Sequence, residues 1–231
     1  MKINLFMPLA KPLLGIVLSF FSFYAVAQDY NESFYDSKRM SLGITFSPNV
    51  SWLRYGDVDV EGTKAKMGYA YGLLADFAFS ENYYFSTGFL INTLNAEARR
   101  YTTVPENQQR FVEVNDYRLQ YAEIPFGVKL KSTQRYYRSY YGLFGFTAGI
   151  KINAKQEVTA ENGTLLQESR NLKGRADLFR LGLQVGGGVE WQLDHNLRLM
   201  TGLSFNNGFT RVIKSDSPRN SFVSFNFGIL F

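Results

Sequence analysis

The sequence predicts an all-β fold, an eight-stranded antiparallel up-and-down β-barrel that spans a membrane. Three observations predict it. Apolar and polar residues alternate with a period of two in eight separate segments, as they do in half-buried strands. The links between these segments are short and long in turn. The chain of 231 residues is also 16% aromatic, with 21 Phe and 15 Tyr, although its mean hydropathy is only −0.17.

The N-terminus predicts a secretory signal peptide. Lys2 and Lys11 give a positive region, an apolar run follows over 12–24, and residues 25–27 form an A-x-A cleavage site. The alternative is a membrane anchor, but the run is shorter than the ~20 apolar residues that a spanning helix needs. The expected organisation is a signal peptide at 1–27, a short periplasmic leader at 28–38 and a barrel domain at 39–231.

The first four strands are expected at 39–50, 67–79, 83–95 and 116–131, and the first of them has the weakest pattern. Each carries large apolar residues at every second position and small or polar residues between them. A period of two is the period of a strand and excludes a helix. The positions expected to face outward include Leu42, Ile44 and Phe46, then Tyr69, Tyr71, Leu73 and Phe77, then Tyr83, Phe85 and Phe89, then Ile124, Phe126, Val128 and Leu130.

The last four strands are expected at 138–152, 177–193, 197–209 and 221–231, with the same alternation. The glycine triplet at 186–188 lies inside one of them with no helix after it, so it predicts a packing or bending feature and not a phosphate loop. The positions expected to face outward include Phe144, Phe146 and Ile150, then Leu181, Leu183, Val185 and Trp191, then Leu199, Leu203 and Phe205, then Val223 and Phe225.

The connections are sorted by length. Links of three to six residues follow the second, fourth and sixth strands, at 80–82, 132–137 and 194–196. Long links, which we expect to be loops, follow the odd strands. Short periplasmic turns and long extracellular loops are typical of outer-membrane barrels, and this arrangement places both termini in the periplasm. The long links are expected at 51–66, 96–115, 153–176 and 210–220.

A secreted lipocalin-like barrel is the competing fold, and the positions of the charges argue against it. The face that alternates with the apolar one holds glycine, serine, asparagine and both signs of charge. A charge on the lipid face at mid-depth costs about 2–4 kcal/mol for Lys or Arg, so these residues should face the lumen. We expect a polar network that fills the lumen, and not an open ion path, because eight strands enclose little space. Its members are expected to be Asp76, Glu123, Lys129, Arg180, Glu190 and Arg198, with Lys151 on the same face.

The aromatic residues fit two belts at the membrane interfaces. Ordinary strand propensity would explain some of the rings, but not their placement at both ends of the strands. The belt near the short turns is expected to contain Tyr83, Tyr136, Tyr137, Tyr140 and Trp191, and the belt near the long loops Trp52, Tyr55, Tyr69 and Tyr71.

The composition excludes several classes of function. With no cysteine and one histidine, the chain has no disulfide, no thiolate or two-histidine metal site and no Cys nucleophile. The net charge of +5 comes without a Lys/Arg cluster, so no nucleic-acid partner is expected. His195 falls in a predicted turn without a partner serine. We therefore expect a monomer that is not an enzyme and has no cofactor.

One segment resembles a known family. Residues 121–129, YAEIPFGVK, are similar to the Y-x-E-I-P-x-x-x-K segment of the PorT family of small outer-membrane barrels in Bacteroidetes. The matching positions are Tyr121, Glu123, Ile124, Pro125 and Lys129. The resemblance implies an accessory role in type IX protein secretion, with secretion components as partners. The alternative is a structural or surface-binding barrel, OmpA-like or OmpX-like, whose loops bind ligands or envelope partners. Pro125, which has no N–H, should mark a bulge or a gap in the ladder.

The last strand ends in an apolar alternation that closes on the final phenylalanine. This pattern resembles the C-terminal signal that the outer-membrane assembly machinery reads, and the residues concerned are Phe227, Ile229 and Phe231. The sequence thus predicts a multi-pass barrel in the cell outer membrane, in contact with its lipids and delivered by that machinery.

Overall fold

A computed structural model of the chain describes residues 40–55, 63–103, 110–160, 165–172, 176–213 and 217–231. The predicted signal peptide and leader lie outside these ranges. Within them, no helix is long and apolar enough to cross a membrane. The strands are β1 (Met40–Arg54), β2 (Thr63–Ser80), β3 (Tyr83–Thr103), β4 (Arg110–Lys131), β5 (Arg138–Ala160), β6 (Leu165–Asn171), β7 (Phe179–Gln192), β8 (Arg198–Arg211) and β9 (Arg219–Leu230).

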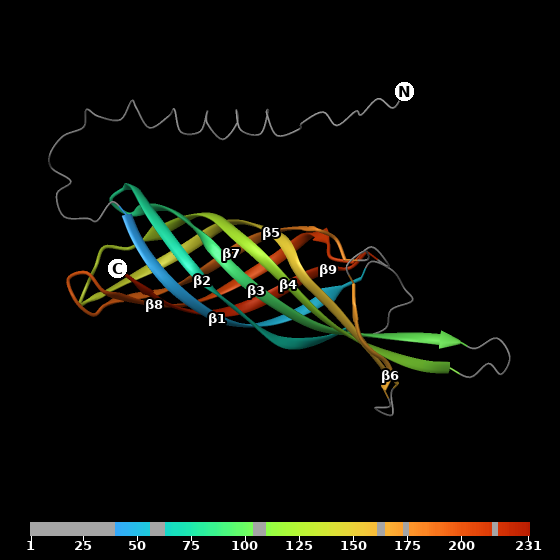
Figure 1. The fold of residues 1–231 in the computed structure, drawn as a ribbon. Helices are drawn as coiled ribbons and strands as arrows, with labels where there is room; N and C mark the ends of the chain where they lie inside the picture. The colour runs from blue at the N-terminus through green and yellow to red at the C-terminus, as the bar shows by residue number, and fades with distance from the viewer. Residues whose placement is uncertain (1–39, 56–62, 104–109, 161–164, 173–175, 214–216) are drawn as a thin grey trace, which may run out of the picture. The chain divides into compact units, whose positions relative to one another are not determined.

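Eight of these strands form a closed antiparallel barrel, which confirms the predicted fold class. The order around the barrel is β1-β2-β3-β4-β5-β7-β8-β9, and β9 pairs with β1 to close it (Figure 1). At the seam, the N–H of Leu42 donates to Phe231 O at 3.1 Å, and the N–H of Phe231 donates to Leu42 O at 2.7 Å. Closure removes the free edges that an open sheet would present.

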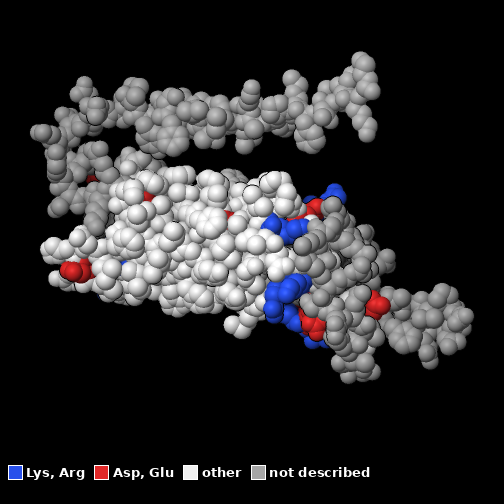
Figure 2. Space-filling model, in the orientation of Figure 1, with Lys and Arg blue, Asp and Glu red and all other residues white. Residues whose placement is uncertain are grey.

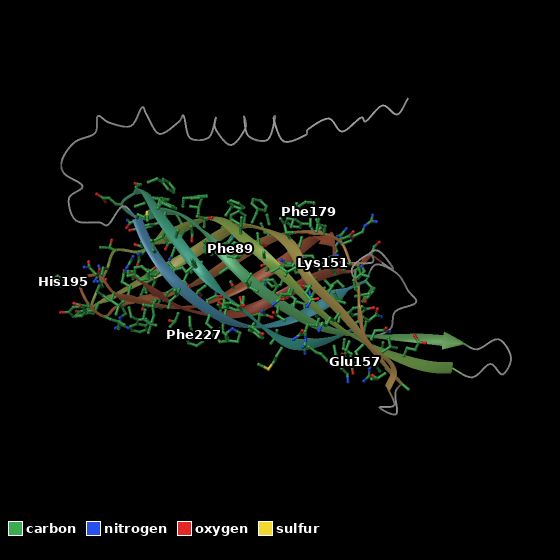
Figure 3. All side chains as sticks on the ribbon, in the orientation of Figure 1. Phe89, Lys151, Glu157, Phe179, His195 and Phe227 are labelled. Atoms are coloured by element: carbon green, nitrogen blue, oxygen red, sulfur yellow. The ribbon has the colours of Figure 1, made fainter. Side chains whose placement is uncertain are left out.

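The wall of the barrel is apolar outside and polar inside. Along β1, exposed and buried side chains alternate over nearly the whole strand. The exposed set includes Phe46, Phe89, Phe179 and Phe227, of which the last three are labelled in Figure 3 (Figure 3). A soluble monomer rarely exposes an apolar patch of more than a few hundred Å², whereas this band surrounds the barrel. The outer wall is therefore a lipid-facing surface, and the lipocalin-like alternative is wrong.

The strands continue beyond the lipid-facing band, which corrects two predicted loops. The segments 96–115 and 153–176 are largely strand, since the β3–β4 ladder runs to the pair Thr103 and Arg110, and β5 runs to Ala160. β6 adds an unexpected ninth strand on β5 outside the barrel. Figure 1 shows these strands projecting past the barrel at the end where the predicted loops lie, called here the loop end.

The physical reason for this correction is a change of solvent. At the loop end of β3, Ala96 and Ala98 continue the buried inner face, while Glu97 and Arg99 take the alternate positions. Glu97 is only 9% exposed, because Lys64, Lys66 and Arg99 surround it. The period of two persists, but the outward residues are charged because they no longer face lipid. The apolar half of the pattern disappears where the strand leaves the membrane.

The opposite end, called here the turn end, has tight connections. Tyr136 and Tyr137 form a two-residue turn between Arg135 and Arg138, which exchange backbone hydrogen bonds of 2.9 and 3.0 Å. Both tyrosines have positive φ, 48° and 63°. This is the backbone of a type I′ turn, which usually takes Asn-Gly. The described chain begins and ends at this same end of the barrel.

Two irregularities lie in β4. Its pairing with β3 is interrupted between Thr87–Phe126 and Leu90–Glu123 without a change of register. The interruption spans Pro125, which cannot donate to the ladder, so the predicted gap is present without a bulge there. A register shift in the β4–β5 pairing lies nearer the loop end, beside Tyr121.

Candidate functional site

The inside of the barrel holds a buried ion network near the turn end. The Lys129 Nζ atom lies 2.7 Å from Asp76 Oδ2 and 2.5 Å from Glu190 Oε1. On the other side of Glu190, Oε2 lies 2.6 Å from Lys131 Nζ and 2.8 Å from Arg198 Nη1. The five side chains of this network come from four strands, β2, β4, β7 and β8. Burial of ions is tolerated only when each is paired and hydrogen-bonded, and here each one has a partner of opposite charge.

Aromatic rings and a hydroxyl complete this network. Lys129 Nζ lies 4.8 Å from the centroid of the Tyr141 ring, and Lys131 Nζ lies 4.7 Å from that of Tyr84. Ser86 donates a 2.6 Å hydrogen bond to Asp76. The faces of aromatic rings attract cations, most strongly where water is excluded. The network contains three cations and two carboxylates, and the rings help to accommodate the additional positive charge.

A second network lies nearer the loop end and is centred on Arg180, which is only 1% exposed. Its Nη1 donates to Glu123 at 3.0 Å, and its Nη2 donates to Asn206 at 2.5 Å. Asn92 donates to the other Glu123 oxygen at 3.0 Å, and Asn206 donates to Thr147 at 2.9 Å. The ion pair is therefore held by neutral amides and a hydroxyl on the neighbouring strands.

Little space is left between the two networks. The cavity there measures about 60 Å³, and small residues such as Ser47 and Ser204 line it together with larger ones such as Leu74 and Tyr141. A space of this size holds only a few water molecules. Gly202 shows how tight this packing is, because a Cβ there would meet the Tyr141 hydroxyl and the backbone of Gly187.

An apolar stopper closes the lumen at the loop end. At this level inward-facing side chains become aliphatic and aromatic, and they pack into one buried cluster. Sequence reasoning missed this layer, although Leu53 and Leu94 continue the inward parity of Asn49 and Asn92 and could have indicated it. The members are Leu53, Leu94, Ala96, Leu119, Tyr121, Ala154, Leu172, Ala176, Val212, Ile213 and Phe222, with Tyr55 and Tyr117 packed against them.

The structure places all six predicted lumen residues inside and divides them between the two networks. Asp76, Lys129, Glu190 and Arg198 belong to the turn-end network, and Glu123 and Arg180 to the second one. The seventh charge on that face, Lys151, is half-buried and donates to the backbone oxygen of Ala176. Sequence reasoning did not include Lys131, Asn92 or Asn206, although each lies at an inward position of its strand.

The residues of the nine-residue motif lie on both faces of β4, because successive side chains of a strand point to opposite sides. Tyr121, Glu123, Pro125 and Lys129 point inward, whereas Ile124 points outward. Tyr121 belongs to the stopper, Glu123 to the second network and Lys129 to the turn-end network, so the motif contributes to all three layers. At the C-terminus, Phe227, Ile229 and Phe231 are exposed on the outer wall.

The predicted aromatic belts are largely exposed on the outer wall, with one exception. At the turn end Tyr83, Tyr136, Tyr137, Tyr140 and Trp191 are all exposed, and at the loop end Tyr69 and Tyr71 are exposed. Trp52 stacks on Phe205 with centroids 6.3 Å apart. The exception is Tyr55, which packs against the stopper and is not part of a belt.

No catalytic or metal-binding set is evident in the described ranges. His195 is fully exposed in the turn after β7, 3.9 Å from Asp194. Among the described residues, no group of three or more His, Asp or Glu side chains is placed to hold a metal ion.

The outer rim at the loop end is charged. Glu97 lies 3.2 Å from Arg99, 3.6 Å from Lys66 and 3.9 Å from Lys64, and Lys66 also contacts Asp116. Figure 2 shows Lys and Arg side chains gathered at this end, while the middle of the wall is almost free of charge on the face shown (Figure 2). The rim therefore marks the limit of the lipid-facing band at the loop end.

Several solved structures resemble this chain at low sequence identity. No curated protein matches the sequence. Solved structures that resemble it include the attachment invasion locus protein Ail of Yersinia pestis, with 16% identity over 84% of this chain and 100% of that chain and a TM-score of 0.36. Neisserial surface protein A shows 13% identity over 82% and 97%, with a TM-score of 0.43. OprG of Pseudomonas aeruginosa shows 11% identity over 83% and 95%, with a TM-score of 0.43.

The decisive match is to a family model. The model described as the outer membrane protein β-barrel domain matches residues 26–214, which is most of the chain. The closed eight-stranded barrel and its apolar outer wall are what such a domain needs in a bilayer. The chain belongs to the outer membrane β-barrel domain family, and it is an outer-membrane protein.

Proposed function

We propose that the protein is a surface-binding barrel that anchors a projecting β-sheet at the outer face of the membrane. The observation that carries this proposal is the continuation of β3, β4 and β5 past the lipid-facing band, with β6 added at their side. Ordered strands hold side chains in fixed positions, which suits recognition better than open loops do. The sheet projects at the loop end, which we place outside the cell, with both termini in the periplasm.

The filled lumen supports the same proposal. Two ion networks and an apolar stopper follow one another along the axis, and the cavity between them is about 60 Å³. Eight strands leave an interior that side chains can fill. A solute path is therefore not the use of this barrel, and its exposed rim is the part available for partners. Nothing in the described side chains suggests catalysis, so we also propose that it is not an enzyme.

Removing the projecting hairpin tests this function. A variant in which 99–114 is replaced by an Asn-Gly turn joins Ala98 to Asn115, which face each other across β3 and β4. We expect it to assemble into a heat-modifiable barrel but to lose the partners that a photo-crosslinker at Arg118 captures on whole cells. The matched control carries the crosslinker at Ile124 on the lipid-facing wall. Identical adducts from the full and shortened proteins would refute the proposal.

A second candidate is an accessory role in type IX secretion, as in the PorT family of Bacteroidetes. The motif at 121–129 supports it, because five of its positions match the segment of that family. The buried positions of Glu123 and Lys129 also fit a role for the motif in building the barrel. A deletion strain that fails to export type IX cargo, and recovers when the gene is returned, would support this candidate. Normal export in the deletion strain would exclude it.

A further inference from the structure

We propose that a groove on the outer rim binds the phosphorylated sugar headgroup of a glycolipid in the adjoining leaflet. The groove lies at the loop end of β2–β5, measures about 440 Å³, and is lined by Tyr69, Thr93, Asn95, Arg118 and Lys155 among others. A second hollow of about 340 Å³ adjoins it and shares Asn95, Arg118 and Lys155. The inference deepens the proposed function, since it names one ligand of the rim and rests on that rim facing the outer leaflet.

The groove presents two cations side by side. Arg118 and Lys155 face each other directly across β4 and β5, and both are exposed. Like charges in this position destabilise a sheet. Neither cation has an ion pair or hydrogen bond with another described residue; Asp116, the nearest acid along β4, is engaged by Lys66 instead. Glu157, opposite Asp116, is likewise outside ion-pair distance of both cations. A phosphate between the cations would relieve their repulsion and accept charge-assisted hydrogen bonds from both.

The floor of the groove points to a sugar. Thr93 is only 5% exposed and its Oγ1 has no hydrogen-bond partner among the described residues. The Oδ1 atom of Asn95 is buried and unpartnered in the same way, while its Nδ2 donates to Met67 O at 2.7 Å. A buried polar atom without a partner costs free energy, so such atoms usually meet a ligand or a water molecule. Asn95 Oδ1 can only accept, and a sugar hydroxyl supplies the donor that it lacks.

The position of the groove identifies the source of that sugar phosphate as a lipid. The edge of the groove nearest the lipid-facing band is formed by Tyr69, which is 45% exposed. The centroid of its ring lies 6.3 Å from that of Tyr71 and 6.5 Å from that of Phe46. These rings lead without a break into the apolar wall. A headgroup in the groove would therefore leave its acyl chains lying along the lipid-facing surface. A soluble phosphate would use the two cations but not the rings or the wall.

The test is native mass spectrometry of the purified full-length barrel in detergent, titrated with lipid A that carries two phosphates. We expect saturable binding at one site and at least a tenfold loss of apparent affinity in Arg118→Gln/Lys155→Gln. Thr93→Val, which keeps the shape of the side chain, should weaken binding severalfold without changing heat-modifiability. Glu157→Gln should bind as well as the wild type or more tightly, because it removes a carboxylate near the phosphate.

Matched controls separate a site from general attraction. Arg211→Gln/Arg219→Gln removes another pair of cations that face each other across strands at the same rim, but away from the groove. An equal loss of binding in this control would overturn the proposal. So would equal binding of dephosphorylated lipid A, or displacement of the lipid by inorganic phosphate at matched concentration. Because the titration in detergent does not depend on orientation or on partners, its failure would leave the proposed anchoring function standing.

Discussion

At Lys129, one ammonium group lies between two carboxylates inside the barrel, and this geometry decides how the residue responds to mutation. Lys129→Met keeps the length of the side chain but leaves Asp76 with only the hydroxyl of Ser86. Glu190 would retain Lys131 and Arg198. The cost should therefore fall mainly on Asp76, at about 3–5 kcal/mol for a broken buried pair.

Urea unfolding of the barrel refolded into lipid vesicles measures this cost. The double variant Lys129→Met/Asp76→Asn removes both charges and should recover a large part of the lost free energy of unfolding. If the double variant were as unstable as the single one, the stranded carboxylate would not be the cause.

Phe231 combines two roles that single variants can separate. Its backbone N–H and carbonyl close the β1–β9 seam with Leu42, while its ring is exposed on the outer wall. Phe231→Ala removes only the ring, whereas deletion of Phe231 removes the seam contacts as well. If the ring is read by the assembly machinery, Phe231→Ala should lower the amount in the outer membrane severalfold and leave unfolding of the refolded protein nearly unchanged.

Cell fractionation and heat-modifiability measure that outcome. Assembly of Phe231→Ala at the wild-type level, with a defect in the deletion alone, would assign the effect to the seam and not to recognition.

For individual residues, the sequence predicts the face but not the partner. Asp76, Glu190 and Lys129 each lie at an inward position of their strand, which the alternation alone indicates. Their meeting depends on the register between strands far apart in the chain, such as β4 and β7, which do not pair directly. Register is set by all the turns and bulges together, so no local pattern could join these three residues.

At the scale of elements, the turn between β4 and β5 has a strained backbone that exposes the rings of Tyr136 and Tyr137 at the turn end. Tyr136 and Tyr137 are 87% and 75% exposed at positive φ, where most residues with a side chain are strained by about 1–3 kcal/mol each. Tyr136→Asn/Tyr137→Gly supplies the residues that a type I′ turn prefers and should raise the free energy of unfolding in detergent by about 1 kcal/mol or more.

The gain should shrink in lipid vesicles, because tyrosine rings at the interface stabilise the membrane-bound state. The comparison of the two media is the measurement. An equal gain in both would show that these rings do not anchor the turn end, and no gain in detergent would show that the turn is not strained.

The limits of the strands show where sequence patterns stop being informative. Inside the membrane, lipid requires an apolar outer face, and positions such as Phe85 and Phe89 made β3 recognisable. Beyond the membrane, that face can carry charges such as Arg99 and Glu97, which pairs with the cations around it, so a strand and a polar loop have the same composition. The projecting part of β3, β4 and β5 could therefore not be predicted, and neither could β6.

At the scale of the whole molecule, three barriers in series close the lumen. The turn-end network, the Arg180–Glu123 network and the apolar stopper each block the axis at a different level. An ion that crossed would have to displace paired charges and then enter a dry apolar layer, where an isolated charge is strongly disfavoured. The wild-type barrel should therefore show no steady conductance in a planar bilayer.

Barriers in series make a prediction that a single constriction would not. Arg180→Ala leaves the stopper and the turn-end network in place, and Tyr121→Ala leaves both networks, so each single variant should remain closed. Conductance should arise only when changes in all three layers are combined, for example Tyr121→Ala, Arg180→Ala/Glu123→Ala and Lys129→Ala/Glu190→Ala in one chain. Recordings from refolded protein, with heat-modifiability as the check of folding, measure this. A steady, ion-selective conductance of the wild type would contradict the filled lumen, and opening by one single variant would reduce the three barriers to one.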